Sequence, residues 1–242
     1  MPAATPWWVA AFAKDYDLLY AHRDDASAAA EVAGVLGYIG QGPGSVVDVC
    51  CGNGRHLQAL LQAGVAATGF DYSEALLARC RQRPLCAGRV CRGDIRRPPL
   101  AGGQRALLLF FTAFGYFDDA ANAETLAALA ACLAPDGWLM LDLPDTDALR
   151  AGLVPASERQ VGDCRIRERR RLTATRVEKD VELVHADGRR HGYTESVRLY
   201  DPPALRALAG SVGLEPVERW PSLRGPSQQD RRHVWWLRPV SH

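Results

Sequence analysis

The sequence predicts an α/β fold that is doubly wound, with a mostly parallel sheet, helices on both faces of that sheet and an inserted antiparallel sheet. Strand and helix patterns alternate four times between residues 46 and 143, which is typical of parallel strands joined by helices. From residue 163 to residue 200 three strand-like segments follow one another instead, with Asp187-Gly188 as a hairpin turn. We therefore expect a single domain over residues 1–242 with an insert at residues 160–200.

Two helices are expected before the first strand, and we assign residues 1–40 to an N-terminal helical lid. Over residues 7–20 the aromatic side chains of Trp8, Phe12 and Tyr16 recur at helix spacing. This aromatic face either packs against the edge of the core or covers a ligand. The second helix is expected at residues 26–37, before a glycine-rich break.

The parallel sheet is expected to form from short apolar runs separated by helices. Residues 45–50 and 106–111 are continuous apolar runs, which suit strands buried on both faces. Ser73 is a suitable N-cap for a helix that ends before Pro84. The other expected elements are helices at residues 55–63, 122–133 and 204–212, a strand that stops at Asp71, and strands at residues 89–91, 138–143, 214–220 and 233–238. The loop at residues 221–230 is long enough to reach over a site.

Length, charge and cysteine content exclude several classes of protein. With 242 residues the chain can bury a sizeable core, and a formal charge of +1 gives no reason to expect nucleic acid or an anionic membrane as partner. No run of eighteen apolar residues and no export-type leader is visible, so we expect a cytoplasmic protein. The seven cysteines include no Cys-x-x-Cys pair, which favours reduced thiols and argues against a metal site.

A Gly-x-Gly turn joins the first strand to its helix. Gly52 and Gly54 permit a positive φ angle and a close approach of the backbone to a ligand. The amides at the start of the following helix point over this turn. A dinucleotide site would carry a third glycine where this chain has Leu57. Asp48, beneath the turn, suits either the ordering of the loop or a ligand that carries an ammonium group.

Acidic residues follow the next two strands of the expected sheet. Asp71 lies 19 residues after Gly52, where an acid can accept hydrogen bonds from ribose hydroxyls. Asp94 follows the third strand, where a carboxylate can meet an adenine amino group. Because the carboxyl ends of parallel strands meet at one edge, where ligands bind, these acids and the glycine turn predict one nucleotide-like site.

These residues lie in motifs that resemble those of class I S-adenosylmethionine-dependent methyltransferases. The matching stretches are D-V-C-C-G-N-G-R-H (residues 48–56), G-F-D-Y-S-E (69–74), R-G-D-I (92–95), F-F-T-A-F-G-Y-F (110–117) and L-A-P-D-G-W-L-M-L-D (133–142). The C-G-x-G-R-H and F-T-x-F-G-Y-F motifs are similar to those of a bacterial subset that methylates small molecules. The resemblance implies a Rossmann-like sheet of seven strands and S-adenosyl-L-methionine as cofactor.

The resemblance also implies roles for individual residues. The glycine turn would line the methionine part of the cofactor, Asp71 would take the ribose, and Asp94 with Ile95 would bind adenine. Phe111 and Thr112 would border the sulfonium. The expected cofactor-binding residues are Tyr20, Arg23, Asp48, Cys50, Gly52, Asn53, Gly54, Asp71, Tyr72, Gly93, Asp94, Ile95, Phe111 and Thr112.

The N-terminal segment is expected to close the cofactor pocket. By the same resemblance Tyr20 and Arg23 are the residues that do so, with Arg23 placed to meet the cofactor carboxylate. His56, at the start of the first helix of the sheet, is interpreted as a structural residue because nothing in the sequence pairs it with an acid.

Candidate catalytic residues come from two places in the chain. Methyl transfer needs an aligned acceptor and, for some acceptors, a base. Tyr116, just beyond the methyl-facing strand end, is the first candidate for a substrate contact, and packing in the loop is the alternative. In the insert, alternation puts His191, Tyr193 and Glu195 on one face, from which a general base can be drawn. An exposed polar face of an ordinary antiparallel sheet is the alternative there.

The leading expectation is a methyltransferase that acts on a small-molecule acceptor, for example in natural-product biosynthesis. Residues 111–116 do not match the patterns of nucleobase methyltransferases, and acids are interleaved with the arginines of the insert, so nucleic acid is not an expected partner. Two alternatives remain: a cyclase-type enzyme that uses the cofactor structurally, and a cofactor-sensing or partner-binding protein. The insert either covers the substrate or forms a homodimer contact.

Overall fold

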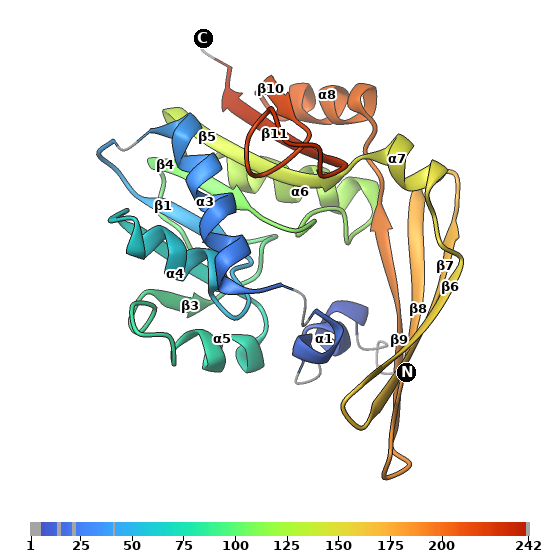
Figure 1. Cartoon of the computed structure of the whole chain (residues 1–242). Coiled ribbons are helices and arrows are strands. Elements are labelled where there is room, and N and C mark those ends of the chain that lie inside the picture. The colour runs from blue at the N-terminus through green and yellow to red at the C-terminus, as the bar shows by residue number, and fades with distance from the viewer. Residues whose placement is uncertain (1–5, 14–15, 21–22, 41, 241–242) are drawn as a thin grey trace, which may run out of the picture.

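The computed structural model describes residues 6–13, 16–20, 23–40 and 42–240, which form two sheets and the helices around them (Figure 1). The central sheet has seven strands in the order β10-β11-β5-β4-β1-β2-β3. Its parallel strands are β1 (Val46–Val49), β2 (Ala67–Asp71), β3 (Val90–Arg92), β4 (Gln104–Leu109) and β5 (Leu133–Pro144). β11 (Arg232–Pro239) is antiparallel to β5 and to β10 (Leu214–Trp220). The predicted mostly parallel, seven-stranded sheet is confirmed.

Helices cover both faces of the central sheet. One layer holds α3 (Asp25–Ile39), α4 (Arg55–Gln62) and α5 (Glu74–Cys80), and the other holds α6 (Asp119–Ala130) and α8 (Pro202–Ser211). Neighbouring residues of β1 point to opposite faces of the sheet and belong to different hydrophobic clusters. Val46 shares a buried cluster with Leu57 of α4, whereas Val47 shares one with Leu126 of α6. Both faces of the strand are buried, so all of its residues are apolar except Asp48.

The strand order reverses between β1 and β4. β2 and β3 lie on the outer side of β1, and β5 lies on the outer side of β4. At such a point the loops that leave the two strands part and open a crevice at the carboxyl edge of the sheet. Three non-glycine residues in these loops, Cys50, Phe111 and Thr112, have positive φ angles of 59°, 52° and 58°. Strained backbone of this kind concentrates at functional sites. A functional site is therefore expected at this edge of the sheet.

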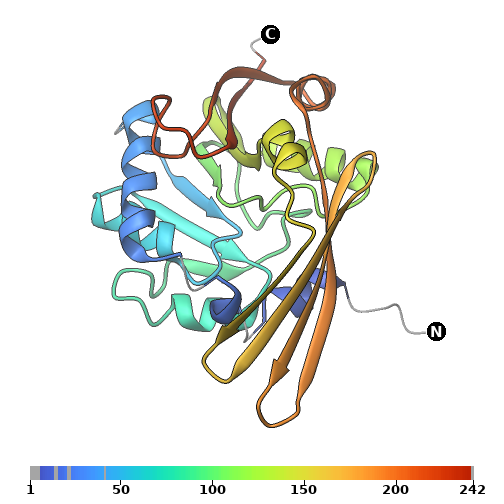
Figure 2. The same cartoon turned by 45° about the vertical axis from the view of Figure 1, so that its right-hand side comes forward.

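The insert is a four-stranded antiparallel sheet that projects along one side of the molecule (Figure 2). Its strands are β6 (Ala156–Val161), β7 (Cys164–Leu172), β8 (Arg176–His185) and β9 (Arg190–Arg198). The last three match the predicted segments, but the first was missed, so residue 160 falls inside a strand instead of at the boundary. β6 alternates exposed and half-buried positions and carries little apolar sequence, which explains why it gave a weak signal. The short helix α7 (Thr146–Ala151), capped by Asp145, was also missed.

The N-terminal segment lies between the central sheet and the insert (Figure 1). In the described residues 7–13 and 16–20 the chain forms two short helices, α1 (Trp7–Ala11) and α2 (Tyr16–Leu19), whereas one helix was predicted. α1 packs on β9, and Leu19 of α2 is buried in a small core with Ile166 and Leu183 of the insert. The Arg159 side chain of β6 donates a hydrogen bond to the Leu19 carbonyl (2.9 Å). Of the expected lid at residues 1–40, positions 1–5, 14, 15, 21 and 22 lie outside the described residues.

Two further expectations need correction. The helix expected at residues 122–133 ends at Ala130, and Leu133 already begins β5. The loop at residues 221–230 does not reach over the crevice; it packs on α3, where a Cβ at Gly34 would lie 2.4 Å from the Leu223 carbonyl oxygen. The predicted cap Ser73 does accept a hydrogen bond from the first turn of α5, and Asp201, which was not predicted as a cap, accepts one from the first turn of α8. Among the described helices, none is long and apolar enough to cross a membrane.

Candidate functional site

The glycine turn after β1 forms the floor of a cavity at the carboxyl edge of the sheet. Gly52 and Gly54 have φ angles of 54° and 79°, which glycine adopts without steric cost. Gly54 is also required by packing, because a Cβ there would lie 2.3 Å from the sulfur of Cys80. The space around this turn holds about 920 Å³ free of atoms, part of it open to solvent. This is within the size range of small-molecule sites.

Asp71 ties the end of β2 to the glycine turn. Its carboxylate accepts hydrogen bonds from the backbone N–H of Gly52 (2.8 Å) and of Ser73 (2.7 Å). Burial raises the pKa of Asp71, and these two N–H donors act in the opposite direction by stabilising the ionised form. The acid therefore lies beside the turn with one hydrogen bond made by each oxygen, and each oxygen keeps a further lone pair that can face the cavity.

Asp48 lies beneath the turn and also lines the cavity. Its side chain is 2% exposed, and its Oδ2 atom has no hydrogen-bond partner among the described residues. Burial raises the pKa of Asp48 well above its usual value. A buried acid with an unsatisfied oxygen is stabilised by a cationic or strongly donating ligand, since an unpaired buried polar atom is costly.

Asp94 lies at the third strand end, where the sequence predicted it, but an unpredicted partner holds it. Arg96 donates from Nε to Oδ1 (3.0 Å) and from Nη2 to Oδ2 (2.6 Å), and its hydrogen bonds lower the pKa of Asp94. The Arg96 guanidinium also lies over the ring of Phe117, 5.0 Å from its centroid. Asp94 is consequently an ionised acceptor whose orientation is fixed, with Ile95 buried beside it.

Phe111 supports an arginine that also lines the cavity. The Arg23 guanidinium lies 4.0 Å from the centroid of the Phe111 ring and 4.4 Å from that of Tyr20. Its Nε atom is buried and has no hydrogen-bond partner among the described residues. Arg55, which the sequence did not single out, lies on the same ring at 5.5 Å. Two cations thus flank one aromatic platform, an arrangement that suits a carboxylate.

His56 has an acidic partner that the sequence did not indicate. Its Nε2 atom lies 2.8 Å from the Glu31 carboxylate of α3, and its ring stacks on Phe110 at a centroid distance of 3.9 Å. The premise that no acid pairs with this histidine was wrong. Burial lowers the pKa of His56, although the Glu31 carboxylate opposes that shift. Because Glu31 is 25 residues away in sequence, no local spacing signals this contact.

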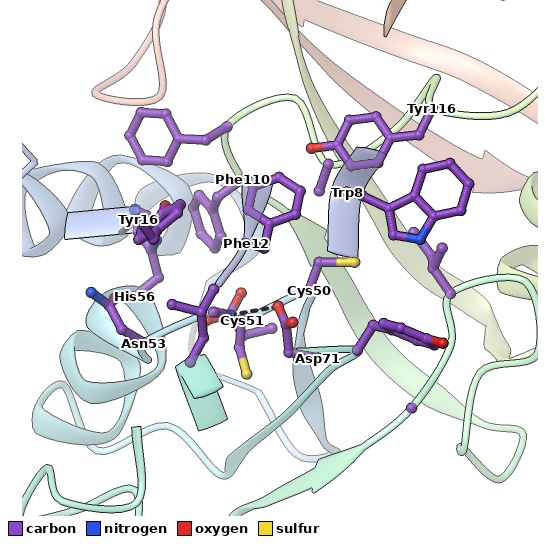
Figure 3. Close-up of a pocket in the computed structure, with 18 of the residues that line it drawn as sticks. Trp8, Phe12, Tyr16, Cys50, Cys51, Asn53, His56, Asp71, Phe110 and Tyr116 are labelled. Atoms are coloured by element: carbon purple, nitrogen blue, oxygen red, sulfur yellow. Dashed lines mark hydrogen bonds between the residues drawn. The ribbon is translucent and has the colours of Figure 1, made fainter. Parts of the chain in front are cut away.

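Aromatic side chains form the wall of the cavity that faces the N-terminal segment (Figure 3). Tyr116 contacts Trp7 at a centroid distance of 4.7 Å and stacks on Phe12 at 6.0 Å. Trp8 packs edge-on against Phe117 at 5.2 Å. Burial raises the pKa of Tyr116 well above its usual value, so its phenol is neutral at ordinary pH. The sequence pointed to Tyr116 but did not show that α1 would complete this wall.

The structure brings most of the predicted site residues to one cavity and leaves others outside it. The cavity is lined by the predicted residues Arg23, Asp48, Cys50, Gly52, Asn53, Asp71, Tyr72, Gly93, Asp94, Ile95, Phe111 and Tyr116. Tyr20 and Gly54 lie directly behind lining residues, and Thr112 is held by Arg232 of β11. His191 is exposed on β9, and Tyr193 packs against the small core of the insert, so neither lines the cavity.

Comparisons with known proteins agree with this geometry. Residues 46–137 match the family model of a methyltransferase domain. A dTDP-3-amino-3,4,6-trideoxy-alpha-D-glucopyranose N,N-dimethyltransferase from Streptomyces venezuelae is 29% identical over 139 residues, which cover 55% of this chain and 58% of that protein. A trans-aconitate 2-methyltransferase from Delftia acidovorans is 35% identical over 102 residues, 41% of this chain and 38% of that protein. The matched part of the chain thus spans less than two thirds of these curated relatives.

Solved structures resemble the chain over almost its whole length. An S-adenosylmethionine-dependent methyltransferase from Clostridium acetobutylicum is 13% identical, with a TM-score of 0.77 over 94% of this chain and 96% of that one. The sugar N-methyltransferase KedS8 from a Streptoalloteichus species is 24% identical, with a TM-score of 0.72 over 93% of each chain. The chain therefore has the fold of the S-adenosylmethionine-dependent methyltransferases. The segment that matches the methyltransferase-domain model, residues 46–137, includes the glycine turn, Asp71 and Asp94.

Proposed function

We propose that this protein is an S-adenosylmethionine-dependent methyltransferase that acts on a small-molecule acceptor. The observation that carries the proposal is the arrangement of ionisable groups in one cavity: the acids Asp48 and Asp71 lie at the glycine turn, and Arg23 lies on Phe111. A ligand with an ammonium, a carboxylate and a ribose matches all three groups. The methyltransferase-domain match over residues 46–137 supports the same function.

The residues of the cavity fit the cofactor at each of its parts. Arg23 Nε and Asp48 Oδ2, both buried and without partners among the described residues, suit the carboxylate and the ammonium of its amino acid. Asp71 would accept hydrogen bonds from the ribose hydroxyls, and Asp94, Ile95 and Tyr72, which line the same cavity, would border the adenine. When bound, S-adenosylmethionine supplies an activated methyl group on sulfur. The chain then has to align the acceptor and exclude water, which the N-terminal lid and the aromatic wall do.

The acceptor is a small molecule that presents a neutral amino group. Among the described residues that line the cavity, the acids and the histidine are already engaged by the cofactor or by a neighbour, since Asp71 and Asp94 are hydrogen-bonded and His56 is held by Glu31. The phenol of Tyr116 stays protonated, so it orients the acceptor and does not deprotonate it. A neutral amine attacks through its lone pair before it loses a proton, and such an acceptor needs no base. The relative from Streptomyces venezuelae and KedS8 are both named for N-methylation.

The insert serves in this proposal as a support for the cavity and not as its wall. We retain His191 and Tyr193 as proposed contacts for a part of the acceptor that extends beyond the cavity. A homodimer through the outer face of the insert is the other use of this sheet that the sequence suggested.

The proposal is tested in two steps with the purified protein. Calorimetry with S-adenosylhomocysteine should show binding in the micromolar range, and absence of heat with both this ligand and S-adenosylmethionine would refute the cofactor assignment. Transfer is then followed by mass spectrometry with cofactor carrying a trideuterated methyl group, against parallel panels of amino sugars, phenols and carboxylic acids. Label in the amines supports the proposal. Label only in the acids or phenols would refute the amine assignment, and binding without transfer in any panel would favour a sensing or cyclase-type protein.

A further inference from the structure

The turn that follows β4 is strained in a way that its own sequence does not relieve. Phe111 and Thr112 have φ angles of 52° and 58°, a conformation that glycine adopts freely but that is a genuine outlier for a β-branched residue such as threonine. Strain of this kind persists only where surrounding contacts over-determine the backbone. Two consecutive residues in this state therefore imply a dedicated set of partners.

Asp142, at the carboxyl end of the neighbouring strand β5, supplies the first set of contacts. Its Oδ2 atom accepts a hydrogen bond from the Phe111 N–H (2.7 Å), and its backbone carbonyl accepts one from the Thr112 N–H (2.9 Å). The Asp142 side chain is fully buried. Both backbone donors of the strained turn are thus satisfied by one residue, so the turn cannot relax without leaving that buried acid short of a partner.

Arg232, the first residue of β11, completes the arrangement. Its Nε atom donates to Asp142 Oδ1 (2.6 Å), and its Nη2 atom donates to the Thr112 hydroxyl (2.9 Å). A planar guanidinium can make both bonds at once because its donors have a fixed fork geometry, which a lysine ammonium lacks. Arg232 therefore links the turn to a strand that follows it by 120 residues.

The turn in its strained form places the Phe111 ring in the cavity and under Arg23. The ring lines the cavity, and the Arg23 guanidinium lies 4.0 Å from its centroid. Thr112, by contrast, faces Arg232. We propose that Asp142 and Arg232 are positioning residues for the cofactor site: they hold the turn at residues 111–112 so that Phe111 presents Arg23 to the carboxylate of the ligand. This inference rests on the proposed function, because it concerns the same cofactor.

The test compares two ligands that differ only at the amino acid end of the cofactor. S-adenosylhomocysteine carries the carboxylate, whereas 5′-methylthioadenosine lacks the whole amino acid part. Arg232→Lys keeps a positive charge beside Asp142 but loses the bond to Thr112. We expect calorimetry to show about tenfold weaker binding of S-adenosylhomocysteine, the size of effect that release of a strained backbone residue produces. Binding of 5′-methylthioadenosine should stay within twofold of the wild-type value.

Two further variants make the test specific. Arg238→Lys is the matched control, because Arg238 lies on the same strand but at its far end, over Trp138, and it should bind both ligands like the wild type. Adding Thr112→Gly to Arg232→Lys should recover most of the lost affinity, since glycine accepts the positive φ angle without help.

Each outcome bears on a different claim. If the wild type binds S-adenosylhomocysteine and Arg232→Lys binds it equally well, the positioning role is refuted while the proposed function stands. Equal weakening of both ligands, with a lowered melting temperature, would show a merely structural role and would also overturn the inference. A double variant no better than Arg232→Lys would refute the part assigned to backbone strain. Failure of the wild type to bind S-adenosylhomocysteine refutes the proposed function itself.

Discussion

Replacing Asp71 by asparagine should weaken cofactor binding by tenfold or more. The carboxylate accepts two short hydrogen bonds, from Gly52 N–H at 2.8 Å and Ser73 N–H at 2.7 Å. An amide keeps one acceptor oxygen but turns an NH₂ group toward the other N–H, so at least one of these bonds is lost. A hydrogen bond to a charged group contributes about 1.5–3 kcal/mol. The neutral amide also replaces a charged acceptor for the ribose hydroxyls. Since about 1.4 kcal/mol corresponds to a factor of ten in affinity, loss of one such charge-assisted hydrogen bond to the ligand predicts a tenfold to hundredfold effect.

The measurement for this prediction is the dissociation constant of S-adenosylhomocysteine by calorimetry. Asp136→Asn is a suitable control, because Asp136 is an exposed acid near the amino end of β5, away from the glycine turn. Thermal unfolding of both variants shows whether any loss reflects a damaged fold. Binding by Asp71→Asn within twofold of the wild type would refute the view that this carboxylate orders the turn and takes the ribose.

Three further variants test other parts of the site. Arg23→Met should weaken S-adenosylhomocysteine binding about tenfold, the cost of one charge-assisted hydrogen bond, and leave 5′-methylthioadenosine binding unchanged; equal loss of both would contradict the assignment of Arg23 to the carboxylate. Tyr116→Phe should slow turnover by at most about tenfold without changing the pH profile, because burial raises the pKa of Tyr116 and keeps it neutral; disappearance of an alkaline limb in the profile would show instead that it acts as a base. Burial lowers the pKa of His56 below its unfolded value of about 6.5, so the unfolded chain binds the extra proton first and stability should fall as the pH drops from 7 toward 5. The melting temperature of His56→Gln should fall less over that range than that of the wild type. An equal fall would show that His56 does not cause the loss of stability.

The sequence was most informative where a residue acts through its own backbone or through near neighbours. Gly52 and Gly54 follow a buried strand directly, and Asp71 ends the next one. In a parallel sheet these positions necessarily meet at one edge. Their mutual contact, Gly52 N–H to Asp71, could therefore be anticipated from strand ends alone. The fold class followed from the same regularity, since repeated strand and helix patterns leave few ways to connect a sheet.

The sequence was least informative where function depends on pairs that no period links. Asp142 and Arg232 are 90 residues apart, and Glu31 meets His56 only because α3 crosses α4. For the insert, alternation correctly put Tyr193 and Glu195 on one face. It could not show that the N-terminal segment lies between that face and the cavity. The candidates on β9 thus share one face of the strand, but none of them lines the cavity.

The insert supports the aromatic wall of the cavity through contacts with the segments that form it, one of which is the N-terminal segment. Among the described residues of the insert, none lines the cavity, yet both parts of the aromatic wall rest on it. Trp8 and Phe12 belong to the segment that packs on β9, and Arg176 of β8 donates hydrogen bonds to the carbonyls of Gly115 and Phe117, on either side of Tyr116. The glycine turn, Asp71 and Asp94, by contrast, lie at the carboxyl ends of β1, β2 and β3 of the central sheet. Under the proposed function, a change in the insert should therefore reshape the acceptor wall while Asp71 and the glycine turn keep their geometry.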